Sequence, residues 1–364
     1  MMVARAKDVL CDLVTASQYD FQIIAKKERG RSKLSLISAV LARELRMFRI
    51  ALQFKPDILI GTDIVITHIG RLLKIPAIIL NEDDESIVPL LAAYGFRYSN
   101  CVISPRSCRF DRYQSKKVEY DGFHKMTYLA PNYFVPNKTL IENDIDLGRP
   151  FFLFRISRLS AHHDVGIGGI SDGLIEKLIS KLSPHGKIYI SSERQLKPKL
   201  AKYKLNIRAE KIHQVLYYST LLIGDSQSMT VEAAILGTPS IRFSDFAGRI
   251  GVLEELEHKY GLTYGIKTSE PEKLYAKIEE LLRTPNLKQE WQKRRQKMLS
   301  EKIDVTAFMV WFIENYPESV KVMRENPDYQ LRFMNNGLPK PSPASRNKNG
   351  LTQRTRRSQS AAEL

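Results

Sequence analysis

Long hydrophobic runs and cysteine pairs are absent from this sequence. No stretch of about 18 apolar residues occurs, which argues against a membrane-spanning helix, and the N-terminus has no apolar core of a secretory signal peptide. The three cysteines, Cys11, Cys101 and Cys108, are odd in number and form no CxxC pair. The sequence therefore predicts reduced, structural thiols in a cytoplasmic protein, rather than a disulfide framework or a zinc site.

Acidic residues are outnumbered by basic ones. The 56 Lys and Arg against 40 Asp and Glu give a formal net charge of +16, and residues 337–364 contribute six basic residues against one acidic, a net of +5. A surface of this sign attracts polyanions, including nucleic acid and anionic lipid headgroups. Aromatic residues are not interleaved with the basic runs as stacking platforms would be. We therefore expect no nucleic-acid binding, and favour a peripheral contact with the inner face of the membrane.

Short apolar strands alternate with helical patterns along most of the chain. A length of 364 residues with 43% hydrophobic residues favours two domains. We expect strands at residues 21–25, 57–61, 77–80, 101–104 and 117–120 in the first half, and at 151–156, 187–191, 205–207, 220–223, 239–243 and 262–266 in the second. This alternation predicts an α/β fold with two parallel, doubly wound, Rossmann-like sheets.

Composition suggests where these domains begin and end. Residues 1–135 are expected to form the N-terminal domain, 136–149 a linker, and 150–316 the C-terminal domain with its terminal helices. Residues 317–364 turn to Pro, Ser, Asn, Gln and Arg, which predicts a basic tail, with disorder expected from about residue 335.

The chain also lacks the strand with which a doubly wound domain normally opens. Residues 4–18 have a helical pattern that follows the first residues directly. Removing a central strand would leave unpaired ladder groups on both of its neighbours. We therefore hypothesise that an N-terminal strand and its loop are missing from this sequence, through a misplaced start or a truncation.

Residues 212–243 form the most informative stretch: a helix, a short apolar strand, a turn of small polar residues and a second helix. Unpaired N–H groups at a helix start, with the macrodipole behind them, favour bound anions. A phosphate is therefore expected at the turn and the first helical residues, which are Ser226, Ser228, Met229 and Thr230. Glu232, one turn into the helix, can accept hydrogen bonds from vicinal hydroxyls such as those of a ribose. The alternative is that the serine is only a cap and the glutamate its capping-box partner.

The motifs of this stretch resemble the donor-nucleotide segment of GT-B enzymes, the UDP-N-acetylglucosamine 2-epimerases and related glycosyltransferases. Those have a strand, an Asp-Ser-Gly-Gly or similar turn, a helix with a Glu-Ala pair, and then Leu-Gly-x-Pro. The corresponding residues here are Gly224–Thr230, Glu232-Ala233 and Leu236–Pro239, with Gln227 and Ser228 where the glycine pair would be. The chain is also similar, over residues 5–316, to a bacterial GT-B-like family catalogued as a domain of unknown function. The resemblance implies the GT-B fold, with the last helices crossing back onto the first domain.

Two further segments of the second half have counterparts in the resembled enzymes. The loop that contains Arg158, His162 and His163 follows the first strand of this half, where the epimerases have a His-Arg-Arg-Glu-Asn loop that reaches the phosphates and supplies a functional histidine. The resemblance implies phosphate or substrate contact, whereas a metal site is disfavoured because adjacent histidines rarely point the same way. Ile212 and His213 begin the helix where such enzymes hold the nucleotide base, although a histidine there can equally be a cap or a surface residue.

Acidic residues follow two expected strands of the first half. Asp63 comes after one and Glu82 after the next, so both fall on the carboxyl edge of the sheet. The epimerases have carboxylates at corresponding turns, which implies acid–base work at the sugar for Asp63 and Glu82. The alternative is that the acidic residues 83–85 only solvate the loop or cap the next helix. His124 and Lys125, near the hinge, could meet the acceptor or the phosphates.

These observations predict a GT-B-like glycosyltransferase that uses a nucleotide-activated sugar, most simply a UDP-sugar, in cell-surface polysaccharide or glycoconjugate biosynthesis. The scheme needs no cofactor and no metal, and the sequence does not identify the acceptor. Epimerisation of a UDP-N-acetylglucosamine-like substrate is the second interpretation. A non-catalytic protein that binds the nucleotide sugar is the third.

Overall fold

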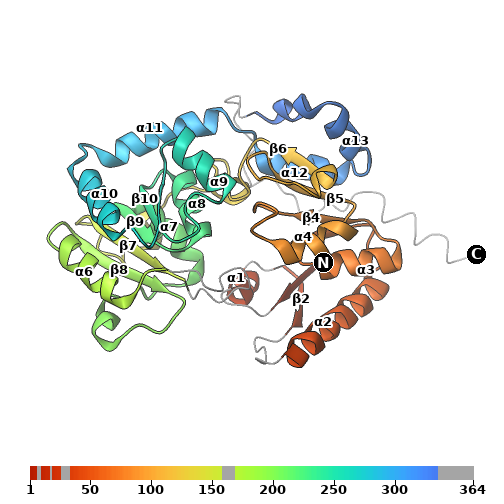
Figure 1. Ribbon diagram of the computed structural model, residues 1–364, viewed down its shortest axis with the longest axis horizontal. Helices are drawn as coiled ribbons and strands as arrows, with labels where there is room; N and C mark the ends of the chain where they lie inside the picture. The colour runs from red at the N-terminus through yellow and green to blue at the C-terminus, as the bar shows by residue number, and fades with distance from the viewer. Residues whose placement is uncertain (6–9, 17–18, 26–32, 158–168, 335–364) are drawn as a thin grey trace, which may run out of the picture. The chain divides into compact units, whose positions relative to one another are not determined.

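Parallel strands with helices between them make up the protein (Figure 1). The structure is a computed structural model that describes residues 1–5, 10–16, 19–25, 33–157 and 169–334. Residues Met1–Met334 form one compact unit. Arg158, His162, His163 and the C-terminal segment 335–364 lie outside the described residues.

The first half of the chain contains two parallel sheets. In chain order its elements are β1 (Met2–Arg5), α1 (Leu10–Ala16), β2 (Phe21–Ala25), α2 (Lys33–Phe54), β3 (Leu59–Gly61), α3 (Val65–Leu73), β4 (Ala77–Leu80), α4 (Pro89–Tyr94), β5 (Cys101–Pro105), β6 (Lys117–Tyr120) and α5 (Met126–Leu129). β1 pairs with β2, and the larger sheet has the order β3-β4-β5-β6. Every pairing is parallel, so the loops after these strands meet at one edge of each sheet.

The second half contains one five-stranded parallel sheet of order β11-β10-β9-β7-β8. Its elements are β7 (Phe151–Ile156), α6 (Asp172–Leu182), β8 (Lys187–Ser192), α7 (Ile212–Tyr218), β9 (Leu221–Gly224), α8 (Gln227–Leu236), β10 (Ser240–Phe243), α9 (Gly251–Glu254), β11 (Tyr264–Ile266), α10 (Pro271–Arg283) and α11 (Leu287–Ser300). All four residues of β9 are buried, because helices cover both faces of the sheet. This is why continuous apolar runs, and not alternating ones, marked its strands in the sequence.

The predicted α/β class with parallel, doubly wound sheets is confirmed. A predicted strand at residues 205–207 is wrong, because only an isolated bridge between Ile190 and Lys204 forms there. Cys101 and Cys108 are buried and free, as predicted for structural thiols.

The start of the chain differs from the prediction. Residues Met2–Arg5 form strand β1, parallel to β2, and the first helix begins only at Leu10. The chain therefore opens with a strand and not with a helix. A strand of four residues, MVAR, is too short for its alternation to stand out from a helical pattern.

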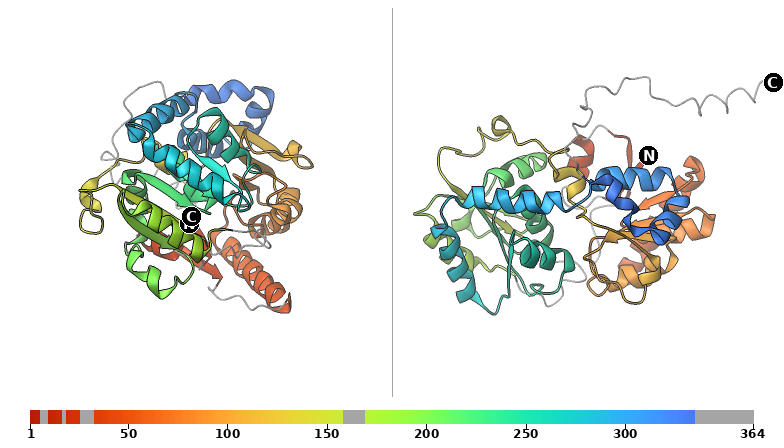
Figure 2. Two further views of the ribbon diagram at one scale, coloured as in Figure 1. Left: turned by 60° about the vertical axis from the view of Figure 1, so that its left-hand side comes forward. Right: turned by 90° about the horizontal axis from the view of Figure 1, so that it is seen from above.

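The end of the second half returns to the first. After α11, helix α12 (Val305–Glu314) contacts α5, and α13 (Glu318–Glu325) contacts β6. The rings of Tyr120 and Phe308 lie 5.8 Å apart, and Ile303 N donates to Asp121 O at 3.0 Å. Figure 2 shows these blue helices beside the orange and yellow elements of the first half. The crossing back that the resemblance implied is confirmed.

Residues just after the predicted C-terminal domain are helical. Residues 318–325 form α13 and residues 327–333 a 3-10 helix, both within the compositional tail 317–364 and before residue 335, where disorder was expected to begin. Met323 is buried, and the rings of Trp311 and Tyr329 stack 4.7 Å apart. A few apolar residues at the right spacing therefore attach a segment whose average composition is polar.

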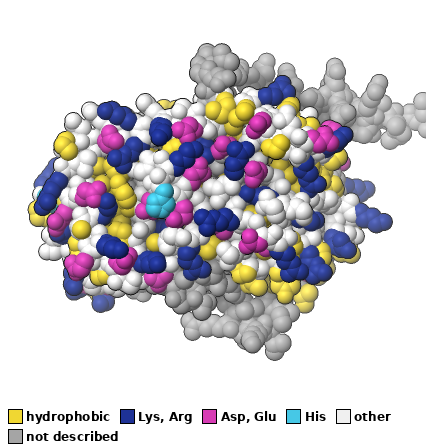
Figure 3. All heavy atoms as spheres, turned by 45° about the horizontal axis from the view of Figure 1, so that its top comes forward, with side chains coloured by type: hydrophobic (Ala, Val, Ile, Leu, Met, Phe, Trp, Pro, Cys, Tyr) yellow, Lys and Arg dark blue, Asp and Glu magenta, His cyan; other side chains and the backbone are white. Residues whose placement is uncertain are grey.

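No helix in the described part of the chain is long and apolar enough to cross a membrane. Basic and acidic side chains are interspersed on the face shown in Figure 3, without a large area of a single sign.

Candidate functional site

The turn between β9 and α8 is built as a capped helix start. Ser226 is the N-cap, and its Oγ accepts a hydrogen bond from Met229 N at 3.4 Å. The Thr230 hydroxyl is buried and donates to Ser226 O at 2.7 Å. Both hydroxyls therefore serve the turn itself, and the capping interpretation of Ser226 is confirmed. Ser228, in the first turn of the helix, is exposed.

Glu232 lies further into α8 and is not the capping-box partner. Because the helix begins at Gln227, Glu232 is its sixth residue, beyond the reach of a capping box. Its carboxylate accepts a hydrogen bond from Tyr128 OH at 2.8 Å and lies 3.4 Å from His213 Nε2. The side chain is only 15% exposed.

Glu232 keeps its negative charge in this environment. Burial acts to raise the pKa of the carboxyl group, but the hydrogen bond and charge of His213, the Tyr128 hydroxyl and the charge of Lys125 outweigh it, so the pKa lies below its ordinary value. A buried carboxylate that stays ionised is a strong acceptor for hydroxyl donors.

His213 is therefore not a simple surface residue. It stands in the first turn of α7, after Ile212, and faces Glu232 from there. Its ring lies 5.5 Å from the ring of Tyr128, which comes from α5 in the first half of the chain. Two aromatic rings and a carboxylate from three helices thus meet at one place.

Glu82, a predicted catalytic acid, is connected to the cluster of Glu232, His213 and Tyr128 by Lys125. Glu82 follows β4 and accepts hydrogen bonds from His124 N at 2.7 Å and Lys125 Nζ at 2.6 Å. Burial acts to lower the pKa of Lys125, but the charge and hydrogen bond of Glu82 outweigh it and raise the pKa, with a further contribution from Glu232. One cation therefore lies within electrostatic reach of both carboxylates.

Asp63 has a different setting. Its carboxylate lies 3.1 Å from Arg5 Nη1 and 3.4 Å from Arg43 Nη1, and accepts a hydrogen bond from Val65 N at 3.1 Å. It therefore joins the end of β1 to α2 and α3. Among the described residues, no hydrogen bond or ion pair connects Asp63 to Glu82 or Glu232.

Two of the neighbouring acidic residues have structural partners. Asp84 Oδ1 accepts from Arg109 N at 2.5 Å and Oδ2 from Gly251 N at 2.7 Å, while Glu85 Oε2 accepts from Asp111 N at 3.0 Å. These two side chains are structural, but they link distant segments of the chain and do not solvate the loop or cap the next helix as the alternative expected.

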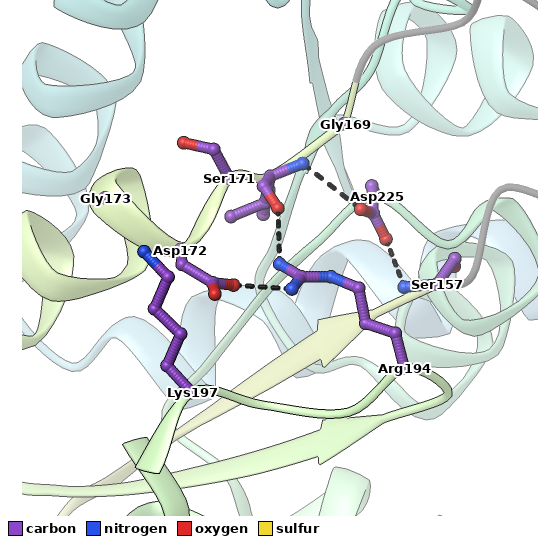
Figure 4. A pocket seen from close by; sticks show the side chains of 9 residues that line it. Ser157, Gly169, Ser171, Asp172, Gly173, Arg194, Lys197 and Asp225 are labelled. Carbon is purple, nitrogen blue, oxygen red and sulfur yellow. Dashed lines mark hydrogen bonds and ion pairs between the residues drawn. The ribbon is translucent and has the colours of Figure 1, made fainter. Parts of the chain in front are cut away.

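A pocket of about 440 Å³ opens at the carboxyl edge of the second sheet (Figure 4). Asp225, directly after β9, accepts hydrogen bonds from Ser157 N at 2.7 Å and Ile170 N at 3.2 Å. Burial raises the pKa of Asp225 despite these bonds. Arg194 donates to Asp172 Oδ1 at 2.5 Å and to Ile170 O at 3.1 Å.

This pocket adjoins the turn that caps α8, because Asp225 lines it and Ser226 follows. The exposed Lys197 also lines it, so two basic side chains belong to its wall. Arg194 and Tyr128 were not among the site residues predicted from the sequence. Arg194 follows β8 at the same sheet edge as Asp225, and this position after a strand was the one feature that could have suggested it.

A separate trio of side chains could hold a cation. Ligand atoms of Glu254, Glu257 and His258 lie within 4.8 Å of one another. Glu257 Oε2 already accepts from Gly265 N at 2.8 Å, and His258 Nε2 lies 3.2 Å from Glu254 Oε2. These contacts explain the arrangement without a metal ion.

Comparison with solved structures identifies the architecture. The protein is similar to Neisseria meningitidis UDP-GlcNAc 2-epimerase bound to UDP-GlcNAc, with 15% identity and a TM-score of 0.57 over 78% of this chain and 83% of that one. It is similar to S. aureus MnaA in complex with UDP, with 12% identity and a TM-score of 0.53 over 93% and 89% of the two chains. The calicheamicin glycosyltransferase CalG4 has 14% identity and a TM-score of 0.51 over 86% and 91%.

The chain has the GT-B fold. At these identities the likeness shows the fold alone. Searches with protein-family profiles and of curated protein sequences find no match. No family profile therefore supports the expected similarity to a bacterial family of unknown function.

Proposed function

We propose that the protein binds a nucleoside diphosphate sugar, most simply a UDP-sugar, at the carboxyl edge of its second sheet, and transfers the sugar to an acceptor. The observation that carries this proposal is the ionised, largely buried Glu232, held between His213 and Tyr128. The GT-B fold supports it, since solved structures of this fold include complexes with UDP and with UDP-GlcNAc.

In this scheme Glu232 accepts hydrogen bonds from the ribose hydroxyls. The diphosphate lies at the start of α8, where the first-turn N–H of Ser228 and the helix macrodipole favour negative charge, while the N–H of Met229 donates to Ser226 Oγ. Arg158 and His162 extend the nucleotide site in the sequence prediction, and Lys125 supplies positive charge from the first half.

The transfer step uses a carboxylate of the first half. Glu82 would take the proton from the acceptor hydroxyl as its oxygen bonds to the anomeric carbon, while the bond from that carbon to the diphosphate breaks and the nucleoside diphosphate leaves with the electron pair. For this, Glu82 must share or release Lys125, its partner at 2.6 Å. Asp63 and His163 remain predicted catalytic residues.

Epimerisation is the second candidate. Several solved structures with this fold are UDP-GlcNAc 2-epimerases, which favours a reaction that needs no acceptor. Incubation of the protein with UDP-GlcNAc alone, followed by NMR, separates the two. An epimer or free UDP would support the isomerase, whereas binding without turnover leaves the transferase or a non-catalytic binding protein.

Titration calorimetry with UDP tests the site itself. Glu232→Ala should weaken UDP binding by at least about tenfold, because hydrogen bonds to a charged group are each worth about 1.5–3 kcal/mol. Glu314→Ala, at an exposed position near the end of α12, is the matched control and should bind as the wild type does.

2′-Deoxy-UDP sharpens this test. The wild type should prefer UDP over the deoxy form, and Glu232→Ala should bind both equally if the carboxylate accepts from the ribose. An undiminished preference would show that Glu232 does not contact the ribose. If the wild type binds no nucleotide at all, the proposed function is wrong.

A further inference from the structure

Helix α2 is apolar on two opposite sides. Its inner side, with Met47, Ile50 and Ala51, is buried. On its outer side Leu41 is 59% exposed, Leu45 50% and Leu52 49%. The outer face of a helix that covers a sheet is normally polar, since only the inner stripe needs to be apolar.

The exposed leucines form one stripe. Spacings of four and seven residues bring Leu41, Leu45 and Leu52 to the same side of the helix. We call this stripe the outer face of α2. It extends toward α3, where His68 contacts Glu44 of α2 at 2.6 Å and Leu72, one turn later on the same side of α3, is 65% exposed. Apolar side chains gathered in this way mark an interaction surface more often than singly scattered ones.

The charged residues around this face are mainly basic. Arg49 and Lys55 are exposed, Arg46 is exposed but donates through Nη1 to Ile24 O, and Glu44 is engaged by His68. The partner that this surface fits is therefore anionic and presents an apolar layer.

We propose that the outer face of α2 docks the protein on an anionic lipid surface. An amphipathic helix that lies in the plane of the interface buries its apolar side chains at the headgroup boundary, while its basic residues contact the headgroups. A second copy of the chain fits less well, because face-to-face packing would bring the exposed arginines of two copies together.

The body of the protein holds α2 in a position that suits this role. Arg43, on its inner side, pairs with Asp63 at 3.4 Å, and Arg46 Nη1 donates to Ile24 O at 3.2 Å. The helix is thus fixed before it meets a membrane, and little conformational entropy is lost on docking.

Vesicle co-sedimentation of the full chain tests the proposal. The wild type should bind vesicles that contain phosphatidylglycerol and should not bind pure phosphatidylcholine vesicles. The double variant Leu45→Ser with Leu52→Ser should lower the partition coefficient by at least about tenfold, because two half-exposed leucines no longer enter the lipid. Both positions are exposed in the folded protein, so folding should be unaffected.

The matched control is Leu90→Ser with Leu331→Ser, which changes two leucines that are equally exposed elsewhere. This control should bind vesicles as the wild type does. Arg49→Gln should weaken binding at low salt and have less effect at high salt.

Three results would overturn the proposal. One is a wild type that does not bind phosphatidylglycerol vesicles. Another is equal loss of binding in the α2 variant and the control, or no loss in either. The third is a dimer of the wild type, seen by light scattering, that the α2 variant abolishes, since the second copy would then be the occupant of this face.

Discussion

Replacement of Asp84 by alanine should destabilise the whole protein. The carboxylate is 2% exposed and joins segments from both halves of the chain: Oδ1 accepts from Arg109 N at 2.5 Å and Oδ2 from Gly251 N at 2.7 Å. The alanine variant removes both acceptors and leaves two backbone N–H groups without their partner.

The expected loss follows from these two bonds. A hydrogen bond to a charged group is worth about 1.5–3 kcal/mol, so their removal should lower the free energy of unfolding by about 3–6 kcal/mol. Asp84→Asn keeps one acceptor oxygen and turns an amide N–H₂ toward the other donor. It should therefore also be destabilising, by about half as much.

Urea unfolding followed by tryptophan fluorescence measures this loss. The sequence has two tryptophans, Trp291 beside the second sheet and Trp311 in α12, so both halves contribute to the signal. The midpoint for Asp84→Ala should fall by about 1 M urea. Asp57→Ala, at an exposed position before β3, is the control. If the two variants unfold at the same urea concentration, the inferred role of Asp84 as a structural link is wrong.

Three other predictions concern stability and reactivity. Burial, with the charge of Arg295 nearby, lowers the pKa of Lys288 from 10.5 to about 7. The free energy of unfolding should thus fall by up to about 1.4 kcal/mol per pH unit as the pH drops between these two values. Urea unfolding of the wild type and of Lys288→Met across this pH range measures it, and the same pH dependence in both proteins would contradict the prediction. Burial also raises the pKa values of Cys101 and Cys108, so iodoacetamide should alkylate both only after unfolding, as read by peptide mass spectrometry, and labelling of the native protein would refute it. Gly237 has a φ of 69°, and a Cβ there would lie 2.5 Å from the Gln292 amide nitrogen. Gly237→Ala should therefore cost about 1–3 kcal/mol in thermal unfolding, whereas Gly173→Ala, which meets nothing within 4 Å, should add about 0.5 kcal/mol, and equal effects would count against the strain at Gly237.

Local chemistry accounts for what the sequence predicted about the candidate site. Neighbouring residues are enough to predict the order of strand, polar turn and helix around Ser226, and the end of α8 at Gly237. A cap, a buried strand and a left-handed terminal glycine each depend on residues a few positions apart. The function of Glu232 was inferred from the same local stretch together with a resemblance.

Local sequence patterns could not predict the partners of the Glu232 carboxylate. Tyr128 is 104 positions away from Glu232 in sequence, and no spacing indicates that its hydroxyl reaches across. Likewise Lys125 follows an unremarkable turn, yet the structure brings it within 2.6 Å of Glu82. Contacts between segments so far apart depend on how the two halves pack.

The sequence by itself determined the α/β class, the parallel strands and the capped turn before α8, because apolar periodicity and turn residues act over short distances. It did not determine that a four-residue strand opens the chain or that residues 318–333 attach to the first half, since neither segment carries a strong local signal. Only the tertiary structure decided which acids are structural, as Asp84 is, and which lie within electrostatic reach of one cation, as Glu82 and Glu232 do. The reason is that the charge and hydrogen bonding of a buried carboxylate depend on the neighbours that folding brings to it.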